Sequence, residues 1–225
     1  MFHPIYTCQH IDHDIKVTGK LDDPAWKMAE VAEMSDIVTG EPIPHRATAR
    51  LLYNDEYLYV GFSCEDDYIH AMLTGDDEPI WREGCFEFFV SPSGNVRYYY
   101  EINVSPLNTL FDTFIINSTE KVDKPKRRMN SFISYTCRNM ITKTWVNGEM
   151  EKPGAAQGWS AEYAIPFVSI AGADNLVPVA GDEWRANMCH IASAERRKEM
   201  VHACWATIGL FDFHIPWFFG TVRFA

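Results

Sequence analysis

Apolar residues along this chain come in short runs of extended character, separated by turn-forming residues. The runs at 47–53 and 57–64 flank a polar Asn-Asp-Glu turn, and together they predict a β-hairpin of aromatic and β-branched residues. The runs at 85–90 and 97–104 flank a Ser-Pro-Ser-Gly-Asn turn and predict a second hairpin. Further strands are expected at 131–137, 158–165, 183–192 and 220–224.

Helical periodicity is scarce in this sequence. Residues 24–32 predict one short helix, with Asp22 or Asp23 as its N-terminal cap. The chain has 225 residues, of which 47% are hydrophobic, so it is long enough to bury the core of one large domain. We therefore expect a single all-β domain over residues 1–225. Its predicted architecture is an antiparallel β-sandwich, jelly-roll or immunoglobulin-like, with long loops and one or two short helices.

The net charge of the chain is −11, from 31 acidic against 20 scattered basic residues. This balance argues against nucleic acid and anionic membranes as partners, and the basic segment 121–128 is expected to be an exposed loop. No segment is apolar enough to span a bilayer, and the N-terminus lacks the features of a signal peptide. We expect a soluble monomer or weak oligomer, cytoplasmic as written and extracellular or periplasmic if a leader has been removed.

The residue pattern gives little support for a bound metal ion or haem. Six cysteines are widely spaced without a Cys-x-x-Cys pair, which predicts buried thiols rather than a zinc or redox site. Calcium would fit the oxygen-rich segments 66–67 and 76–78, although no individual ligand is assigned. A haem would need Met188, His190 or His202 as an axial ligand, and the sequence has no Cys-x-x-Cys-His attachment motif.

The segment around residue 81 carries the residue types that recognise a sugar. Trp81 stands just before a strand-like run in which Glu87 is the one carboxylate among large apolar residues. An indole packs against the C–H face of a pyranose, and a carboxylate accepts hydrogen bonds from its hydroxyls. Glu87, Glu101 and Asn103 fall on alternating strand positions, so they can share one face of a sheet. Taken alone, the segment favours the simpler interpretation of Trp81 as core and Glu87 as a solvated strand residue.

A series of motifs in a fixed order carries a family resemblance over nearly the whole chain. Trp81 and Glu87 stand six residues apart in the middle of this series. The other members are GKLDDPAW at 19–26, LYV at 58–60, GWSAEYAIPF at 158–167, GDEWRAN at 181–187 and FHIPWFFG at 213–220. Together they resemble carbohydrate-binding module family 9. The resemblance implies a non-catalytic β-sandwich that binds mono- or oligosaccharides, notably the reducing ends of glucans and xylans, beside a polysaccharide-degrading enzyme such as a xylanase.

The resemblance also implies a sugar-binding site with six residues: Trp81, Glu87, Glu101, Asn108, His202 and Trp205. In the family two tryptophans clamp one sugar, and the matching positions here are Trp81 and Trp205. Glu101 stands where the family tends to carry glutamine, and His202 where it uses asparagine. Asn108 falls near a sugar-binding arginine of the family, so this positive donor is missing. The departures leave the expected fold intact and open the question of reducing-end specificity.

The other tryptophans are expected to have different roles. Trp26, Trp159 and Trp184 are flanked by alternating apolar residues, so we expect them in the core. Trp145 lies in a stretch rich in threonine and lysine, which indicates an exposed position at a hairpin.

Two alternatives to sugar binding stay open from the residues alone. Glu87 and Glu101 could face each other across a hairpin at the separation of about 5 Å that a retaining glycosidase uses. The chain would then be a glycoside hydrolase. The second alternative is a sandwich that has lost its sugar site and serves as a structural or interaction domain.

Overall fold

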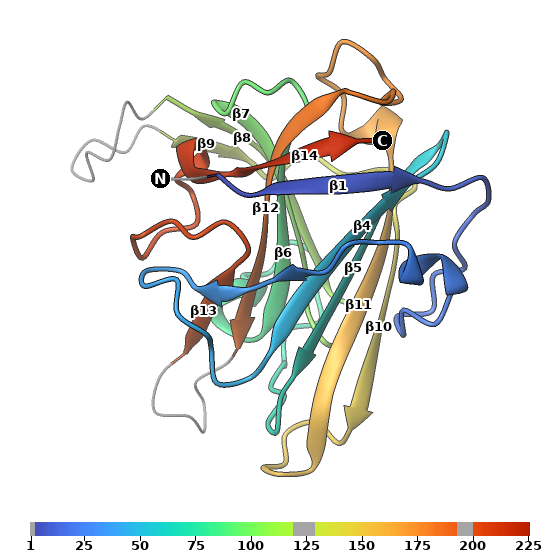
Figure 1. Cartoon of the computed structure of the whole chain (residues 1–225). Helices are drawn as coiled ribbons and strands as arrows, with labels where there is room; N and C mark the ends of the chain where they lie inside the picture. Colours follow the sequence, from blue (N-terminus) through green and yellow to red (C-terminus); the bar gives the residue numbers. More distant parts are fainter. Residues whose placement is uncertain (1–2, 119–128, 193–199) are drawn as a thin grey trace.

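The computed structural model describes residues 3–118, 129–192 and 200–225. Nearly all its regular elements are strands, which form one continuous curled sheet that folds into two packed layers (Figure 1). The order across the sheet is β10-β11-β5-β4-β1-β14-β12-β6-β7-β8-β9. The all-β sandwich predicted from the strand pattern is confirmed.

The first layer contains most of the central and C-terminal strands. In spatial order these are β9 (Met129–Phe132), β8 (Leu110–Asn117), β7 (Tyr98–Val104), β6 (Cys85–Ser91), β12 (Glu183–Ala192) and β14 (Gly220–Phe224). Each neighbouring pair is antiparallel. The short strand β13 (Val201–Cys204) pairs with β12 and with the two-residue β3 (Ser35–Asp36).

The second layer faces the first across the core. Its strands are β10 (Ile141–Gly148), β11 (Ala156–Pro166), β5 (Tyr57–Glu65) and β4 (Ala47–Tyr53), with the short β2 (Ala32–Glu33) paired to β4. Helix is confined to the short 3-10 turns η1 (Pro24–Lys27), η2 (Ile80–Arg82), η4 (Phe167–Ser169) and η5 (Pro216–Phe218) within the described residues. None of these helices is long and apolar enough to cross a membrane.

Strand β1 (Ile5–His10) joins the two layers and departs from the antiparallel expectation. Its first residues pair in parallel with β14, and Gln9 and His10 pair in parallel with Leu52 and Tyr53 of β4. This pairing connects the two ends of the chain, as Figure 1 shows by the blue strand beside the red one. Local hydrophobic periodicity carries no information about such a long-range pairing, so the sequence does not reveal it.

The core between the layers is built on aromatic contacts across the sandwich. The ring of Phe86 on β6 stacks on Phe62 of the opposite layer at 4.9 Å between centroids, and lies 4.1 Å from the ring of Trp159. Trp26 and Trp184 are buried as well, so the predicted burial of all three tryptophans is confirmed. This packing holds β6 rigidly, and β6 carries Glu87 on its other face.

Several predicted elements differ in extent from those observed. The helix expected at 24–32 is the single turn η1, where the Asp23 carboxylate accepts a hydrogen bond from the Ala25 amide at 2.9 Å. The strand expected at 131–137 is β9, which ends earlier because the chain turns after Phe132. Six strands of the described residues are missed by the sequence pattern: β1, β2, β3, β8, β10 and β13. The basic segment 121–128 lies outside the described residues.

Candidate functional site

A pocket of about 580 Å³ opens on the outer face of the first layer. Side chains from β6, β7, β8, β9, β12 and β13 line it, together with η2 and residues 211–214. Four of the six predicted site residues meet here: Trp81, Glu87, Glu101 and His202. Segments that are far apart in the sequence therefore converge on one concave surface.

Strand alternation explains how the two carboxylates reach this pocket. On β6, Phe86 and Phe88 point into the core between the layers, so Glu87 points to the outer face. Glu87 lies directly opposite Asn103 of β7, and Glu101 is two residues from Asn103 on the same face. Both carboxylates are buried, with relative exposures of 2% and 6%, so the simple interpretation of Glu87 as a solvated residue is wrong.

A shared amide links the two carboxylates. The Asn103 Nδ2 group donates to Glu101 Oε1 at 2.8 Å and to Glu87 Oε1 at 3.4 Å. On the other side, His214 Nε2 lies 3.8 Å from Glu101 Oε2, and His214 Nδ1 is hydrogen-bonded to the Tyr99 hydroxyl at 3.0 Å. The carboxylates thus belong to a polar network that orders them before any ligand arrives.

The surroundings of Glu87 change the pKa of its carboxyl group. Burial, and next the negative charge of Glu101, raise the pKa of the Glu87 carboxyl well above its ordinary value, against a smaller opposing effect of the Cys85 thiol. A protonated Glu87 can donate a hydrogen bond, whereas an ionised carboxylate only accepts. The site therefore offers both donors and acceptors, which suits hydroxyl groups because each hydroxyl does both.

This pKa shift leads to a prediction for stability. The folded protein holds the Glu87 proton more tightly than the unfolded chain does, so the contribution of Glu87 to the unfolding free energy is expected to fall as pH rises above 4.5. The slope contributed by Glu87 reaches up to about 1.4 kcal/mol per pH unit until the raised pKa is passed. Glu87→Gln removes this contribution, so the variant should gain stability relative to the wild type as pH increases. Urea unfolding at a series of pH values measures the difference.

The control for this experiment is Glu56→Gln, which changes an exposed carboxylate in the turn between β4 and β5. Its unfolding free energy at neutral pH should differ from that of the wild type by about 0.5 kcal/mol or less, because the side chain lies on the surface. If the Glu87→Gln curve runs parallel to the wild type over the whole pH range, burial does not perturb the Glu87 carboxyl.

Aromatic side chains form the walls of the pocket. Trp81 on η2 is 37% exposed, and its ring lies edge-on to Phe111 at 4.7 Å between centroids. Phe211 is 63% exposed and packs against the His202 ring at 4.5 Å. Burial lowers the pKa of the His202 imidazole, which favours the neutral ring. The pocket thus combines exposed ring surface with buried polar groups.

The structure places the other two predicted residues elsewhere. Trp205 packs edge-on against Tyr6 at 6.2 Å and lies against Gly220, where a side chain would collide with its ring. Asn108 lies in the turn between β7 and β8, in a left-handed backbone conformation. Neither residue lines the pocket.

Sequence reasoning missed the segment 211–214 as part of the site. The motif FHIPWFFG overlaps this segment, but it pointed only to family membership and not to a role at the pocket. Phe211, Phe213 and His214 reach the pocket because the loop after β13 folds back over the outer face of the first layer.

The two segments that were expected to suit calcium differ in their hydrogen bonds and in their potential metal ligands. Glu78 accepts hydrogen bonds from the backbone amides of Thr74 and Gly75, and Asp76 accepts one from Leu110. Among the described residues, the groups that could share a metal ion include Asp66 and Asp67 but none of residues 76–78. Two carboxylates of the acidic turn at 76–78 thus accept hydrogen bonds from backbone amides, those of Glu78 within the turn and that of Asp76 from β8.

A β-sandwich with a pocket of aromatic rings and buried carboxylates on one outer face defines a ligand-binding module. The family model of carbohydrate-binding family 9 matches residues 36–224, and the chain belongs to this family. Its members are non-catalytic binding modules, which supports binding over hydrolysis for the Glu87 and Glu101 pair.

Solved structures share the fold over nearly the whole chain. A protein from Bacteroides uniformis, proposed to bind carbohydrate, superposes with a TM-score of 0.70 at 19% identity and covers 100% of both chains. A family 9 module from Caldicellulosiruptor kristjanssonii in complex with cellotriose has a TM-score of 0.66 at 13% identity, covering 98% of this chain and 93% of the other. Its complex with glucose has a TM-score of 0.65, with coverages of 99% and 96%.

One curated sequence is also similar. A protein of Arthroderma benhamiae named "Extracellular protein" is 26% identical over 191 residues, which cover 82% of this chain and 81% of that protein.

Proposed function

We propose that the pocket on the outer face of the first layer binds a mono- or oligosaccharide of the glucan or xylan type. The observation that carries this proposal is that Trp81 and the buried pair Glu87 and Glu101 line one pocket. The related modules solved with glucose and cellotriose support a sugar as the ligand.

Each part of the pocket has a role in this proposal. The exposed indole of Trp81 packs against the C–H face of a pyranose ring, and Phe211 offers ring surface from the other loop in place of a second tryptophan. Glu101 accepts hydrogen bonds from sugar hydroxyls, while Glu87 accepts or donates according to its protonation. His202 contributes a further polar edge.

The dimensions of the pocket set limits on the ligand. A volume of about 580 Å³ lies within the range of about 300–1,000 Å³ that is usual for small-molecule sites. A flat sugar offers few apolar atoms and loses freedom on binding, so a dissociation constant that is micromolar or weaker is expected. Such affinity suits a module that holds a polymer reversibly, and we propose a role beside polysaccharide breakdown.

Trp81→Ala is expected to weaken sugar binding at least about tenfold, because the largest exposed ring of the pocket is lost. Calorimetry with glucose, cellotriose and xylo-oligosaccharides measures the change. The matched control is Trp145→Ala, which removes a tryptophan of similar exposure, 39%, from β10 in the other layer. This control should bind as the wild type does.

Two results would contradict the proposal. The absence of binding to every glycan would favour a sandwich that has lost its sugar site. Loss of affinity in Trp145→Ala with retention in Trp81→Ala would move the site to the second layer. Incubation of the wild type with the same oligosaccharides should produce no new reducing ends, since the proposed role of the carboxylates is hydrogen bonding.

A further inference from the structure

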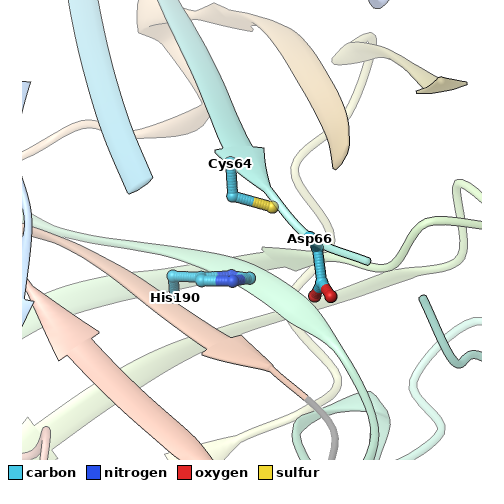
Figure 2. A group of neighbouring side chains, drawn as sticks. All are labelled: Cys64, Asp66 and His190. Atoms are coloured by element: carbon cyan, nitrogen blue, oxygen red, sulfur yellow. The ribbon is translucent and has the colours of Figure 1, made fainter. Parts of the chain in front are cut away.

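Cys64, Asp66 and His190 converge at one end of the sandwich, and none of them lines the pocket on the outer face of the first layer. Their potential ligand atoms all lie within 4.8 Å of one another, and all three residues are buried. Figure 2 shows the side chains pointing into a common space between the strand of Cys64 and the strand of His190. Cys64 belongs to β5 and His190 to β12, so the group spans the two layers.

The fold holds each member of this group in place. Cys64 points inward from β5 and is paired in register with Trp159. Asp66 follows the end of β5, where its carboxylate accepts a hydrogen bond from the Tyr68 amide at 2.9 Å. The His190 ring packs against Phe86 at 4.7 Å between centroids, and the Trp159 ring lies 6.3 Å away. The three positions are thus set by sheet register and core packing.

The hydrogen bond of His190 decides which ring nitrogen can bind a metal. Nδ1 lies 3.2 Å from the backbone oxygen of Cys85. A carbonyl oxygen only accepts, so Nδ1 carries the proton and donates, and Nε2 keeps its lone pair. A backbone carbonyl on one nitrogen and a metal on the other is the common arrangement of metal-binding histidines.

A second group connects the buried one to the surface. His45, Asp66 and Asp67 also lie within 4.8 Å of one another, and Asp66 belongs to both groups. His45 Nε2 is 3.8 Å from Asp67 Oδ1, and these two side chains are 35% and 67% exposed. An ion could therefore enter from the His45 side and reach the buried three.

We propose that Cys64, Asp66 and His190 form a zinc site, with a water on the His45 side as the fourth ligand. Sulfur, imidazole and carboxylate together are the donors that Zn²⁺ takes, whereas Ca²⁺ takes oxygen alone. Zinc–ligand bonds of about 2.0–2.3 Å in a tetrahedral site require the ligand atoms of the three side chains to move closer to one another by roughly 1 Å. The ion would join β5 to β12 and so stabilise the contact between the two layers.

A cysteine nucleophile is the rival use of these residues. It would need Asp66 to orient the histidine through Nδ1, and that nitrogen donates to the Cys85 carbonyl instead. Burial of all three residues would also keep a substrate away from the thiol. The geometry favours a small ion over a substrate.

The test uses the untagged chain, stripped of metal with a chelator and dialysed against Zn²⁺. Elemental analysis should find about one tightly held zinc ion per chain. A large excess of Ca²⁺ should not displace it. At free zinc about 100-fold above the dissociation constant, the midpoint of thermal unfolding should rise by roughly 5–10 °C. Cobalt in place of zinc should show a charge-transfer band from thiolate to metal, which histidines on the surface cannot produce.

Variants test whether Cys64, Asp66 and His190 are the residues that bind the zinc ion. Cys64→Ala should lose both the bound zinc and the thiolate band, while Cys137→Ala, which removes another buried thiol of the same core, should keep them. Asp66→Asn should weaken zinc binding at least about tenfold, because a charged ligand is lost. The site is overturned if the wild type retains no zinc, if its cobalt form lacks the thiolate band, or if Cys64→Ala gives the same spectrum. The wild-type spectrum decides the matter even if a variant does not fold. None of these readouts depends on sugar binding.

Discussion

Replacement of Glu162 by alanine is expected to lower the unfolding free energy by about 3–5 kcal/mol. Glu162 on β11 is fully buried and accepts hydrogen bonds from four groups of the N-terminal segment: the Thr18 amide at 2.7 Å, the Thr18 hydroxyl at 3.2 Å, the Gly19 amide at 2.5 Å and the Trp26 indole at 2.7 Å. Alanine would leave these donors without their acceptor in a buried place.

The hydrogen bonds of Glu162 connect two of the sequence motifs that carry the family resemblance. Gly19 and Trp26 begin and end the motif GKLDDPAW, and Glu162 lies in the motif GWSAEYAIPF. The carboxylate thus fastens the N-terminal segment over the outer face of the second layer, where Trp26 packs on Leu52 and Tyr59. Loss of this anchor should release the segment before the sandwich itself unfolds.

Urea unfolding with tryptophan fluorescence tests this expectation. The control is Glu183→Ala, which removes an exposed carboxylate paired with Arg223 at 2.8 Å and should cost no more than about 1 kcal/mol. An equal loss in both variants would mean that the buried hydrogen bonds of Glu162 contribute nothing special.

Phe86→Ala is expected to destabilise the protein by a similar amount, about 3–5 kcal/mol. Phe86 is fully buried and contacts rings of both layers, with Phe62 at 4.9 Å, Trp159 at 4.1 Å and His190 at 4.7 Å between centroids. Alanine would leave a cavity that the rigid strands around it cannot close. The midpoint of urea unfolding should fall while its slope stays the same, since the exposed surface on unfolding hardly changes.

The matched control for this core variant is Phe132→Ala. Phe132 is 44% exposed on the edge strand β9, so its removal should change the unfolding free energy by about 0.5 kcal/mol or less. A small effect of Phe86→Ala, similar to that of the control, would show that the layers repack around the missing ring.

Much of the first layer was predictable because strand alternation is a local property. Side chains alternate between the two faces of a strand, so the sequence predicted that Glu101 and Asn103 share one face and that Glu87 can face Glu101 across the hairpin. Strand β12 was predicted with its observed ends. The short strand β13 and the half-exposed edge strand β10 were missed, since neither has a strong apolar run.

The site was predicted less completely than the fold. Trp81 and the two carboxylates reach the pocket as the motifs implied, and His202 joins them. Trp205, the expected second tryptophan of the clamp, lies against Tyr6 instead, whereas Phe211, which was not predicted, lines the pocket. The direction of a loop side chain depends on the surface against which the loop packs. The spacing of residues along the chain carries no information about that packing.

The alternation of apolar and polar residues along the chain therefore determined the all-β class, the two central hairpins and the common face of the carboxylates. Only the tertiary structure decided the parallel pairing of β1, the path of residues 211–214 and the meeting of Cys64, Asp66 and His190. The widely spaced cysteines gave no sign of the proposed metal site, because its three residues come from opposite layers. Alternation acts between neighbours in sequence, whereas the packing of two layers joins residues more than a hundred positions apart.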